Sequence, residues 1–351
     1  MSKIKFYFIL LIATIAVISC NKDDNSVTPT PVKPYAEQYP IDSLAINTYL
    51  KTNYFTVLNH PGFPDDQDVT ITKITPTGNQ PSIWSYLNSP TLPKLLSREV
   101  YHNKITYKIY YLVIKEGVKD ANGIGGESPC NVDAVFTGYK GTLLDGSVFD
   151  SSNNGQLQFN LDGSNSNGGV GVFVKGWSEI FPQFKTGTYT SKNDGTVVYN
   201  DFGVGVMFLP SGLGYYNASQ TGIPAYSPLV FSIKLYALKR IDHEFKYVGT
   251  IAVAEPDGIP SYLEDINRDG YVRTTSQLPP GDLNPDDSDK DGTPDFLDFD
   301  DDGDNYATRG EIKDTNGNYY PYDLIPDCSG NIPTDIKKKR HLDASCHFMN
   351  Q

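Results

Sequence analysis

The feature that most constrains this chain is an acidic stretch near its C-terminal end. Eleven of the 23 residues from 282 to 304 are aspartates, and Lys290 is the only basic residue among them. Carboxylates are almost never buried without a partner, so a stretch of this composition cannot build a hydrophobic core by itself. This part of the chain must therefore be held by something other than apolar packing, or remain unfolded.

The acidic residues follow a regular spacing. Oxygen-bearing side chains occupy alternate positions and a glycine follows the third, in three places: Asp265, Asn267 and Asp269 before Gly270; Asp287, Asp289 and Asp291 before Gly292; and Asp298, Asp300 and Asp302 before Gly303. Alternate carboxylates can converge on one hard cation because the loop turns around it, and the glycine permits the sharp bend. Ca²⁺ is favoured over Mg²⁺, which prefers a tighter octahedral site.

Residues 287–304 resemble the thrombospondin type 3 repeats, in which consecutive loops share calcium ions. The resemblance adds Asp295 and Asp304 to the predicted ligands, whereas the bidentate Glu of an EF-hand is missing because Arg309 stands in its place. We therefore expect structural Ca²⁺ in residues 256–351, and disorder of this region without metal because the carboxylates repel one another. A solvated acidic linker is the alternative.

The N-terminus carries an export signal. Lys3 and Lys5 precede an apolar run at 6–18 that is too short to span a bilayer and ends in Ser19 and Cys20. Val-Ile-Ser-Cys at the end of this signal resembles the lipobox of bacterial lipoproteins, which implies cleavage before Cys20 and its lipidation. The Asn-Lys-Asp-Asp that follows resembles the signal that sends some Bacteroidetes lipoproteins to the outer face of the outer membrane. An ordinary secretory signal is the alternative.

These features predict an outer-membrane lipoprotein of the cell envelope, and leave open which leaflet holds it. Since no later segment is long and apolar enough to cross a membrane, the lipid is the only expected membrane contact. The formal charge of -13 argues against nucleic acid as a partner. Cys328 and Cys346 can pair in an oxidising envelope, but the sequence leaves this pairing open, with Cys130 free or buried.

The middle of the chain predicts short strands separated by turns. Residues 104–115 and 131–138 are rich in β-branched and aromatic residues, and Asp145-Gly146 between apolar flanks is typical of a hairpin. Residues 173–184 change to a helical period, after which 204–209 and 229–238 again predict strands. One helix among antiparallel strands indicates an α+β fold, a twisted sheet wrapped around a short helix.

A smaller α+β extension precedes this domain. Residues 41–50 have helical spacing with Asp42 or Ser43 as the N-cap, and residues 69–72 alternate like a strand. The predicted divisions are a signal peptide at 1–19, a tether at 20–38, the extension at 39–116, the central domain at 117–240, a connecting segment at 241–255 and the acidic tail at 256–351.

Five blocks of the central domain resemble, in order, the signature of FKBP-type peptidyl-prolyl cis-trans isomerases. They are Phe-Thr-Gly at 136–138, Asp-Gly-Ser-Val-Phe-Asp-Ser-Ser at 145–152, Val-Lys-Gly-Trp-Ser-Glu at 174–179, Leu-Pro-Ser-Gly-Leu-Gly-Tyr at 209–215 and Leu-Val-Phe at 229–231. Each block is weak alone, but five in register are specific. The family fold implied is a twisted antiparallel sheet that curls around one short helix, with an aromatic pocket between them.

The resemblance also implies which side chains form the site. The catalytic set is Asp150, Trp177, Tyr215 and Phe231, and the substrate-binding walls are Phe136, Phe149, Phe159, Val174 and Ile223. In the family, the position of Trp177 is the pocket floor, that of Tyr215 donates a hydroxyl hydrogen bond, and the backbone N–H matching Ile223 holds the substrate carbonyl. Ordinary core packing is the alternative for each aromatic residue.

Such a pocket needs no cofactor. Rotation about an X-Pro bond has a barrier of about 18–20 kcal/mol because amide resonance is lost in the twisted state. The twisted amide has a less polar carbonyl, so a dry apolar cavity binds it better than the planar ground state, and this difference is the catalysis. We expect proline-containing exported polypeptides as substrates. A non-catalytic module that grips proline peptides is the alternative function, and adhesion through the tail is a third.

Three features depart from the family pattern. Gly155 stands where many members carry a basic residue that pairs with Asp150, and Phe136 stands where Tyr is frequent, which removes a hydroxyl near Asp150. The chain also has two insertions relative to the family pattern, one at 163–171 and one at a predicted hairpin of 188–200. The apolar walls remain, so isomerase activity is still expected.

Overall fold

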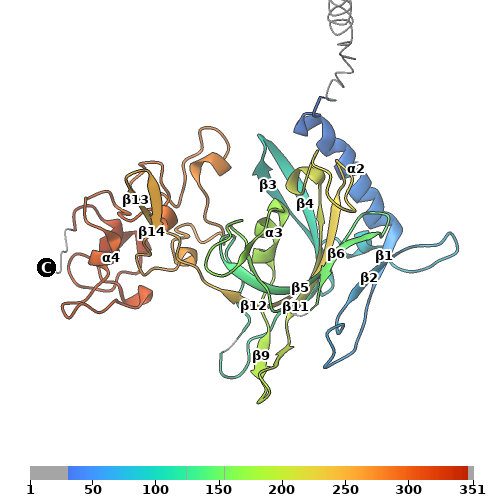
Figure 1. Ribbon diagram of the computed structural model, residues 1–351, viewed down its shortest axis with the longest axis horizontal. Coiled ribbons are helices and arrows are strands. Elements are labelled where there is room, and N and C mark those ends of the chain that lie inside the picture. Colours follow the sequence, from blue (N-terminus) through green and yellow to red (C-terminus); the bar gives the residue numbers. More distant parts are fainter. Residues whose placement is uncertain (1–30, 124, 154, 347–351) are drawn as a thin grey trace, which may run out of the picture. The chain divides into compact units, whose positions relative to one another are not determined.

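The computed structural model describes residues 31–346 except 124 and 154. An eight-stranded sheet with the order β3-β4-β11-β12-β5-β7-β8, and with β6 paired to β5, organises the central part (Figure 1). Its strands are β3 (Lys94–His102), β4 (Ile105–Lys115), β5 (Ala134–Thr142), β6 (Val148–Ser152), β7 (Gln158–Asn160), β8 (Val170–Gly171), β11 (Gly203–Leu209) and β12 (Leu229–Lys239). Only β7 and β8 pair in parallel within this sheet.

Both faces of the sheet are covered, which explains why β11 is buried along its whole length. Met207 and Leu209 face a cluster that includes helix α3 (Lys175–Ile180), whereas Val206 and Phe208 face a second cluster that includes helix α2 (Tyr35–Thr52). Successive side chains alternate between the faces because the strand period is two. A strand covered on both faces therefore shows a continuous apolar run in the sequence.

The N-terminal extension covers the second face. Helix α2 leads into the hairpin of β1 (Asn53–Val57) and β2 (Val69–Lys73). The predicted helix exists, but it begins at Tyr35, so the predicted N-cap is wrong. Asp42 lies inside the helix and is 1 % exposed, and its carboxylate accepts hydrogen bonds from the backbone N–H and the Oγ of Ser211 at 2.8 and 2.6 Å. Asp42 therefore links helix α2 to the sheet domain and does not cap the helix.

The predicted boundary between residues 116 and 117 falls inside one sheet. Strand β4 comes before this boundary and β11 after it, yet they are hydrogen-bonded neighbours. Strands β3 and β4 of the expected extension are thus part of the central domain.

The central elements agree with the sequence. The strands predicted at 104–115, 131–138, 204–209 and 229–238 correspond to β4, β5, β11 and β12, and the helical period falls on α3. Gly146, at φ 87°, occupies the turn between β5 and β6. The inserted hairpin is present as β9 (Thr188–Ser191) and β10 (Val197–Asn200). The α+β class is confirmed.

The rest of the described chain is mostly irregular. The segment at 241–255 contains the hairpin of β13 (Phe245–Val248) and β14 (Ile251–Ala254), and the tail contains the short helix α4 (Thr308–Glu311). Short 3-10 helices punctuate the chain: η1 (Ile83–Tyr86), η2 (Phe181–Gln183), η3 (Ser211–Leu213), η4 (Ser261–Leu263), η5 (Thr275–Gln277), η6 (Asp295–Leu297), η7 (Tyr322–Leu324), η8 (Ile336–Lys338) and η9 (Arg340–Leu342).

Cysteine and membrane features complete the fold. Cys328 and Cys346 form a disulfide, which settles the pairing that the sequence left open, and Cys130 is a buried free thiol. No helix among residues 31–346 has the length and apolar character needed to cross a membrane. The predicted signal, Cys20 and most of the tether lie outside the described residues.

Candidate functional site

An aromatic cluster lies between α3 and the sheet. Helix α3 carries Trp177, which is 3 % exposed, and the ring centroids of Phe159 and Phe231 lie 5.6 and 5.4 Å from its ring. Phe149 packs edge to face on Phe231 at 5.5 Å. Edge-to-face geometry places the positive edge of one ring on the negative face of another, which holds such clusters in defined positions. The predicted residues found in this cluster are Phe149, Phe159, Val174, Trp177, Tyr215, Ile223 and Phe231.

A carboxylate and two hydroxyls line the polar edge of the cluster. Asp150 is exposed on β6 and accepts a hydrogen bond of 2.6 Å from the hydroxyl of Tyr139, whose ring lies 5.1 Å from that of Trp177. Burial and the hydrogen bond to Asp150 raise the pKa of Tyr139, and burial followed by the same carboxylate raises the pKa of Tyr215. Both hydroxyls therefore stay protonated at neutral pH and can act as donors.

Tyr139 takes the place predicted for Phe136. Phe136 lies three residues earlier on β5, pairs with Ala237 and Gln158, and is absent from the cluster around Trp177. An odd separation along a strand puts a side chain on the opposite face. Strand β5 contains two aromatic-x-glycine triplets, 136–138 and 139–141, and only the second directs its ring at Trp177. The predicted loss of a hydroxyl near Asp150 is therefore wrong.

The backbone donor predicted at Ile223 is already paired. Its N–H donates to the carbonyl of Gln220 at 2.9 Å in an isolated β-bridge, although its side chain is buried in the cluster. A substrate carbonyl would have to displace this bond. The buried indole N–H of Trp177, in contrast, has no acceptor in the described part of the chain.

Gly155 has a steric reason to lack a side chain. Its φ is 60°, and a Cβ built there would lie 2.4 Å from Cδ2 of Tyr236. A basic residue therefore does not fit at this position without movement of the backbone or of Tyr236. Asp150 is instead held by Tyr139 and by the backbone N–H of Ser151, at 2.8 Å.

The first two acidic loops share one backbone conformation. In each loop the fourth and sixth residues have positive φ: Arg268 and Gly270 at 59° and 86°, and Lys290 and Gly292 at 67° and 102°. In each, the backbone N–H of the sixth residue also donates to the carboxylate of the first, at 2.6 Å to Asp265 and at 3.2 Å to Asp287. The regular spacing in the sequence thus corresponds to a repeated turn.

The third loop is shifted by two residues from its predicted position. Its positive-φ residues are Gly303 at 70° and Asn305 at 73°, and the N–H of Asn305 donates to Asp300 at 2.9 Å. The alternating positions are therefore Asp300, Asp302 and Asp304, and the predicted triad that starts at Asp298 is wrong. Gly303 occupies the fourth position, while Asn, which tolerates positive φ, replaces glycine at the sixth.

The carboxylates of the second and third loops converge. The groups Asp287, Asp289 and Asp291, and Asp300, Asp302 and Asp304, each offer ligand oxygens within 4.8 Å of one another. One buried oxygen on each of Asp287, Asp300 and Asp302 lacks a hydrogen-bond partner. Asp295 does not join either group, because its two oxygens accept from the backbone N–H and the hydroxyl of Ser288 at 2.8 and 2.7 Å. Clustered hard oxygen donors fit Ca²⁺.

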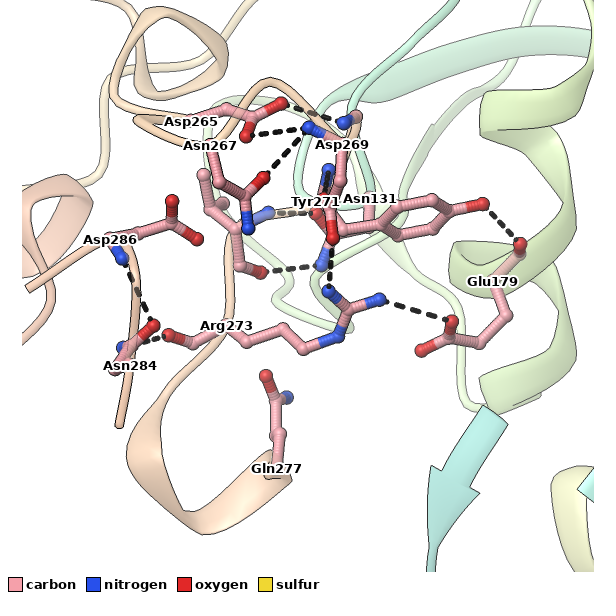
Figure 2. Close-up of polar contacts among 12 residues, drawn as sticks. Asn131, Glu179, Asp265, Asn267, Asp269, Tyr271, Arg273, Gln277, Asn284 and Asp286 are labelled. Atoms are coloured by element: carbon pink, nitrogen blue, oxygen red, sulfur yellow. Dashed lines mark hydrogen bonds and ion pairs between the residues drawn. The ribbon is translucent and has the colours of Figure 1, made fainter. Parts of the chain in front are cut away.

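The residues just after the first loop contact α3 directly, as Figure 2 shows. Tyr271 follows this loop, its hydroxyl donates to the carbonyl of Glu179 at 2.7 Å, and the guanidinium of Arg98 lies 3.7 Å from its ring centroid. Val272 exchanges two hydrogen bonds of 2.8 Å with the side chain of Asn131. Sequence motifs gave no signal for these contacts, because they join segments far apart in the chain.

Glu179 is the buried charge at this contact. Its carboxylate lies 2.8 Å from Lys175, 3.2 Å from Arg98 and 3.9 Å from Arg273. Burial acts to raise the pKa of Glu179, but the positive charges of Lys175 and Arg98 outweigh it and hold the pKa below its ordinary value. The carboxylate is therefore ionised at neutral pH and ties the helix that carries Trp177 to both β3 and the tail.

Comparison with known proteins matches the central domain and the acidic tail to two different family models. Residues 125–191 match the family described as FKBP-type peptidyl-prolyl cis-trans isomerase, and residues 254–335 match a family described as BamM C-terminal. The FKBP-type peptidyl-prolyl cis-trans isomerase FkpA of Escherichia coli (strain K12) is 34% identical over 116 residues, which are 32% of this chain and 34% of FkpA. The chain thus spans about a third of the length of the curated relatives it matches.

Solved structures of isomerases are similar to parts of the chain. The crystal structure of FkpA from Escherichia coli matches with a TM-score of 0.27 and 31% identity over 37% of this chain and 48% of that one. A peptidyl-prolyl cis-trans isomerase from Pseudomonas syringae pv. tomato str. DC3000 matches with a TM-score of 0.32 and 16% identity over 60% of this chain and 100% of that one. The sequence matches support an FKBP-type domain in the central segment, with residues 125–191 matching the family model.

Proposed function

We propose that this chain is a peptidyl-prolyl cis-trans isomerase whose active site is the aromatic cluster around Trp177. The observation that carries the proposal is the position of that cluster inside an FKBP-type domain, with Phe159 and Phe231 against the indole and the pair Tyr139–Asp150 at its edge. In this proposal a prolyl ring packs on the apolar rings of the cluster, with the Tyr139–Asp150 pair at one side.

The proposed mechanism is preferential binding of the twisted amide. Apolar walls disfavour the planar amide, whose carbonyl is more polar, and each 1.4 kcal/mol of preference for the twisted state gives about a tenfold rate increase. The hydroxyl of Tyr139 is committed to Asp150. The hydroxyl of Tyr215 and the indole N–H of Trp177 are then the donors for substrate carbonyls. The mechanism uses no metal or cofactor.

Exposed apolar side chains near the cluster support an unfolded polypeptide as the substrate. Phe173, next to Val174 of the cluster, is 75 % exposed, and Val148 and Val170 on β6 and β8 are also exposed. Apolar residues that flank a proline in an unfolded chain can pack on such side chains. A folded partner would bury its own apolar residues and make less use of them. Proline-containing exported polypeptides are the substrate class that fits.

Exchange spectroscopy of a short Ala-x-Pro-Phe peptide tests the proposal. The soluble chain, starting after Cys20, should speed cis-trans exchange of the peptide, and Trp177→Leu should abolish the increase. Trp84→Leu is the matched control, because Trp84 packs on the cluster at the other face of the sheet. If the peptide shifts the Trp177 indole resonance without faster exchange, the protein binds proline peptides but does not isomerise them.

That binding-only function is the second candidate, and one observation favours it. The N–H of Ile223 is paired with Gln220 rather than open to a substrate carbonyl. A site with one donor fewer would still hold a prolyl ring by apolar contact, yet stabilise the twisted amide less well.

We further propose that the chain is an outer-membrane lipoprotein anchored through Cys20. The support is the N-terminal signal ending in Val-Ile-Ser-Cys. Metabolic labelling with a fatty acid should mark the wild-type protein and leave Cys20→Ala unlabelled. Labelling of both proteins would contradict the proposal.

The acidic loops are proposed Ca²⁺ sites. The support is the repeated turn at Asp265, Asp287 and Asp300, together with unpaired buried oxygens in the second and third loops. The ions would contribute to structure rather than to isomerisation, by neutralising carboxylates that otherwise repel one another.

A further inference from the structure

Five buried or partly buried acidic side chains that are not ligand positions of the repeated loops meet in the C-terminal part of the chain. Asp257, Glu264 and Asp301 offer ligand oxygens within 4.8 Å of one another, and Asp242, Glu244 and Asp257 form a second such group that shares Asp257. Asp257, Glu264 and Asp301 are 1 %, 3 % and 2 % exposed. Asp301 lies between Asp300 and Asp302, which are ligand positions of the third loop. The alternate spacing that identifies the loop therefore does not identify Asp301 as a ligand.

Seven of the ten carboxylate oxygens in this group lack a hydrogen-bond partner in the described part of the chain. Both carboxylate oxygens of Glu264 and of Asp301 are buried without a hydrogen bond, as is one oxygen each of Asp242, Glu244 and Asp257. The ion pairs found among the described residues involve none of these five side chains. These unpaired oxygens converge in the protein interior, whereas the oxygens of a solvated acidic patch would face water.

Burial of unpaired carboxylates has a large energetic cost. An ionised carboxylate in an apolar interior is stable only with a partner cation or a metal, and otherwise takes up a proton. A cation of high charge would remove this cost by keeping the group ionised.

We propose that Asp257, Glu264 and Asp301 bind a Ca²⁺ ion in the interior of the tail, at a site distinct from the three acidic loops. Ligand oxygens lie about 2.3–2.6 Å from Ca²⁺, so oxygens on opposite sides of one ion are about 4.8 Å apart. The ligand oxygens of the group all lie within this distance of one another, so one ion can contact all three residues. Mg²⁺ fits less well, because it retains several waters and this site is enclosed by protein.

The shared residue Asp257 extends the site toward Asp242 and Glu244. Their carboxylates would sit next to the bound ion and balance its charge, or hold a second ion that Asp257 bridges. The number of ions bound decides between these two forms of the same site.

The buried ion would hold segments of the chain together, as apolar packing does in a hydrophobic core. Glu264 and Asp301 are 37 residues apart (301 minus 264), and Asp242 and Glu244 come from the segment that leaves the central sheet at β12. One ion would thus join segments whose apolar clusters, such as that of Ile259, Ile312 and Ile325, are small. This inference does not depend on isomerase activity.

Counting bound ions in matched variants tests the inference. The soluble chain, stripped with a chelator and then supplied with Ca²⁺, is measured by native mass spectrometry and by calorimetric titration. Glu264→Gln keeps the shape of the side chain but removes its charge, and should bind at least one ion fewer than wild type. Asp289→Asn, in the second loop, is the control and should retain the buried ion, which chelator removes most slowly.

The outcomes separate the buried site from the loops. Loss of ions in Asp289→Asn alone, with the wild-type number and affinities in Glu264→Gln, would overturn the buried site and leave the loop sites intact. The reverse result would support the buried site and not the loop. If Glu264→Gln does not fold, Glu264→Asp is the second variant, because it keeps the charge and shortens the side chain. This variant should still fold and should bind the slowly released ion at least tenfold more weakly than wild type. An unchanged affinity for that ion would overturn the proposal.

Discussion

At the scale of single residues, the hydroxyl of Tyr139 fixes the polar edge of the aromatic cluster. It donates to Asp150 at 2.6 Å while its ring packs on Trp177. We predict that Tyr139→Phe lowers kcat/KM for a proline peptide about three- to tenfold, because Asp150 loses its partner and the ring its fixed position. The free energy of unfolding should fall by only about 1 kcal/mol.

Steady-state kinetics and urea unfolding check this prediction. Tyr189→Phe is the control, since Tyr189 is exposed on the inserted hairpin. A Tyr139→Phe protein with wild-type kcat/KM would show that the contact with Asp150 has no catalytic role.

Gly155 yields a prediction about stability. Gly155→Ala should lower the free energy of unfolding by more than Gly195→Ala, because both glycines have positive φ, 60° and 83°, but only at Gly155 does a Cβ meet another residue. The backbone cost alone is about 1 kcal/mol. Thermal unfolding of the two variants measures the difference. Gly155→Lys should not raise activity, and an active, stable Gly155→Lys protein would contradict the steric argument.

At the scale of elements, Glu179 joins α3 to β3 and to the tail. Glu179→Gln should destabilise the protein by on the order of 3 kcal/mol, because it leaves Lys175, Arg98 and Arg273 without their buried partner. Glu127→Gln is the matched control: Glu127 is exposed and 3.8 Å from Arg240, so its loss should cost about 0.5 kcal/mol or less. Urea unfolding at neutral pH measures both changes.

The contribution of Glu179 also has a predicted pH dependence. Its pKa is lower in the folded chain than in the unfolded chain, so the unfolded state binds the proton more readily on acidification. The stabilisation is therefore fully present above the ordinary Glu pKa of about 4.3 and is lost as pH falls through the folded value. The difference between wild type and Glu179→Gln should shrink in that acidic range. A difference that grows there would show that the sign is wrong.

Helices and strands with a local sequence pattern were predictable, but the contacts that these elements make with distant parts of the chain were not. Period-two and helical patterns identified β4, β5, β11, β12 and α3. The N-cap prediction failed because a polar residue near the start of a helix normally suggests a cap. Asp42 instead binds Ser211, which is 169 residues away in the sequence, so no local pattern indicates this contact. Tyr139 was missed because a similar aromatic-x-glycine triplet begins three residues earlier, at Phe136. The two rings differ in the face of the strand on which they lie, and the triplet itself does not show this.

At the scale of the whole molecule, apolar packing organises the sheet domain and buried charge dominates the tail. Removal of Ca²⁺ should therefore expose residues 256–346 to protease and leave the central sheet folded. Limited proteolysis with mass spectrometry, in Ca²⁺, in Mg²⁺ and in chelator, measures this. Equal protection of the tail in Ca²⁺ and in chelator would contradict the calcium proposals together.

The two kinds of acidic site differ in how far the sequence reveals them. The loops were found from spacing, with an error of two residues in the third, because their ligands are adjacent in the chain. The buried group at Asp257, Glu264 and Asp301 has no such spacing, since its members come from separate segments that only the fold brings together.

The central claim is that the aromatic cluster catalyses prolyl isomerisation, and the most direct test is the cis-to-trans rate of an Ala-x-Pro-Phe peptide. The soluble chain should raise this rate above the uncatalysed value in proportion to enzyme concentration, with Ca²⁺ or with chelator, and Trp177→Leu should return it to that value while remaining folded. A folded wild-type protein that leaves the rate unchanged, or a Trp177→Leu protein as active as wild type, would contradict the claim.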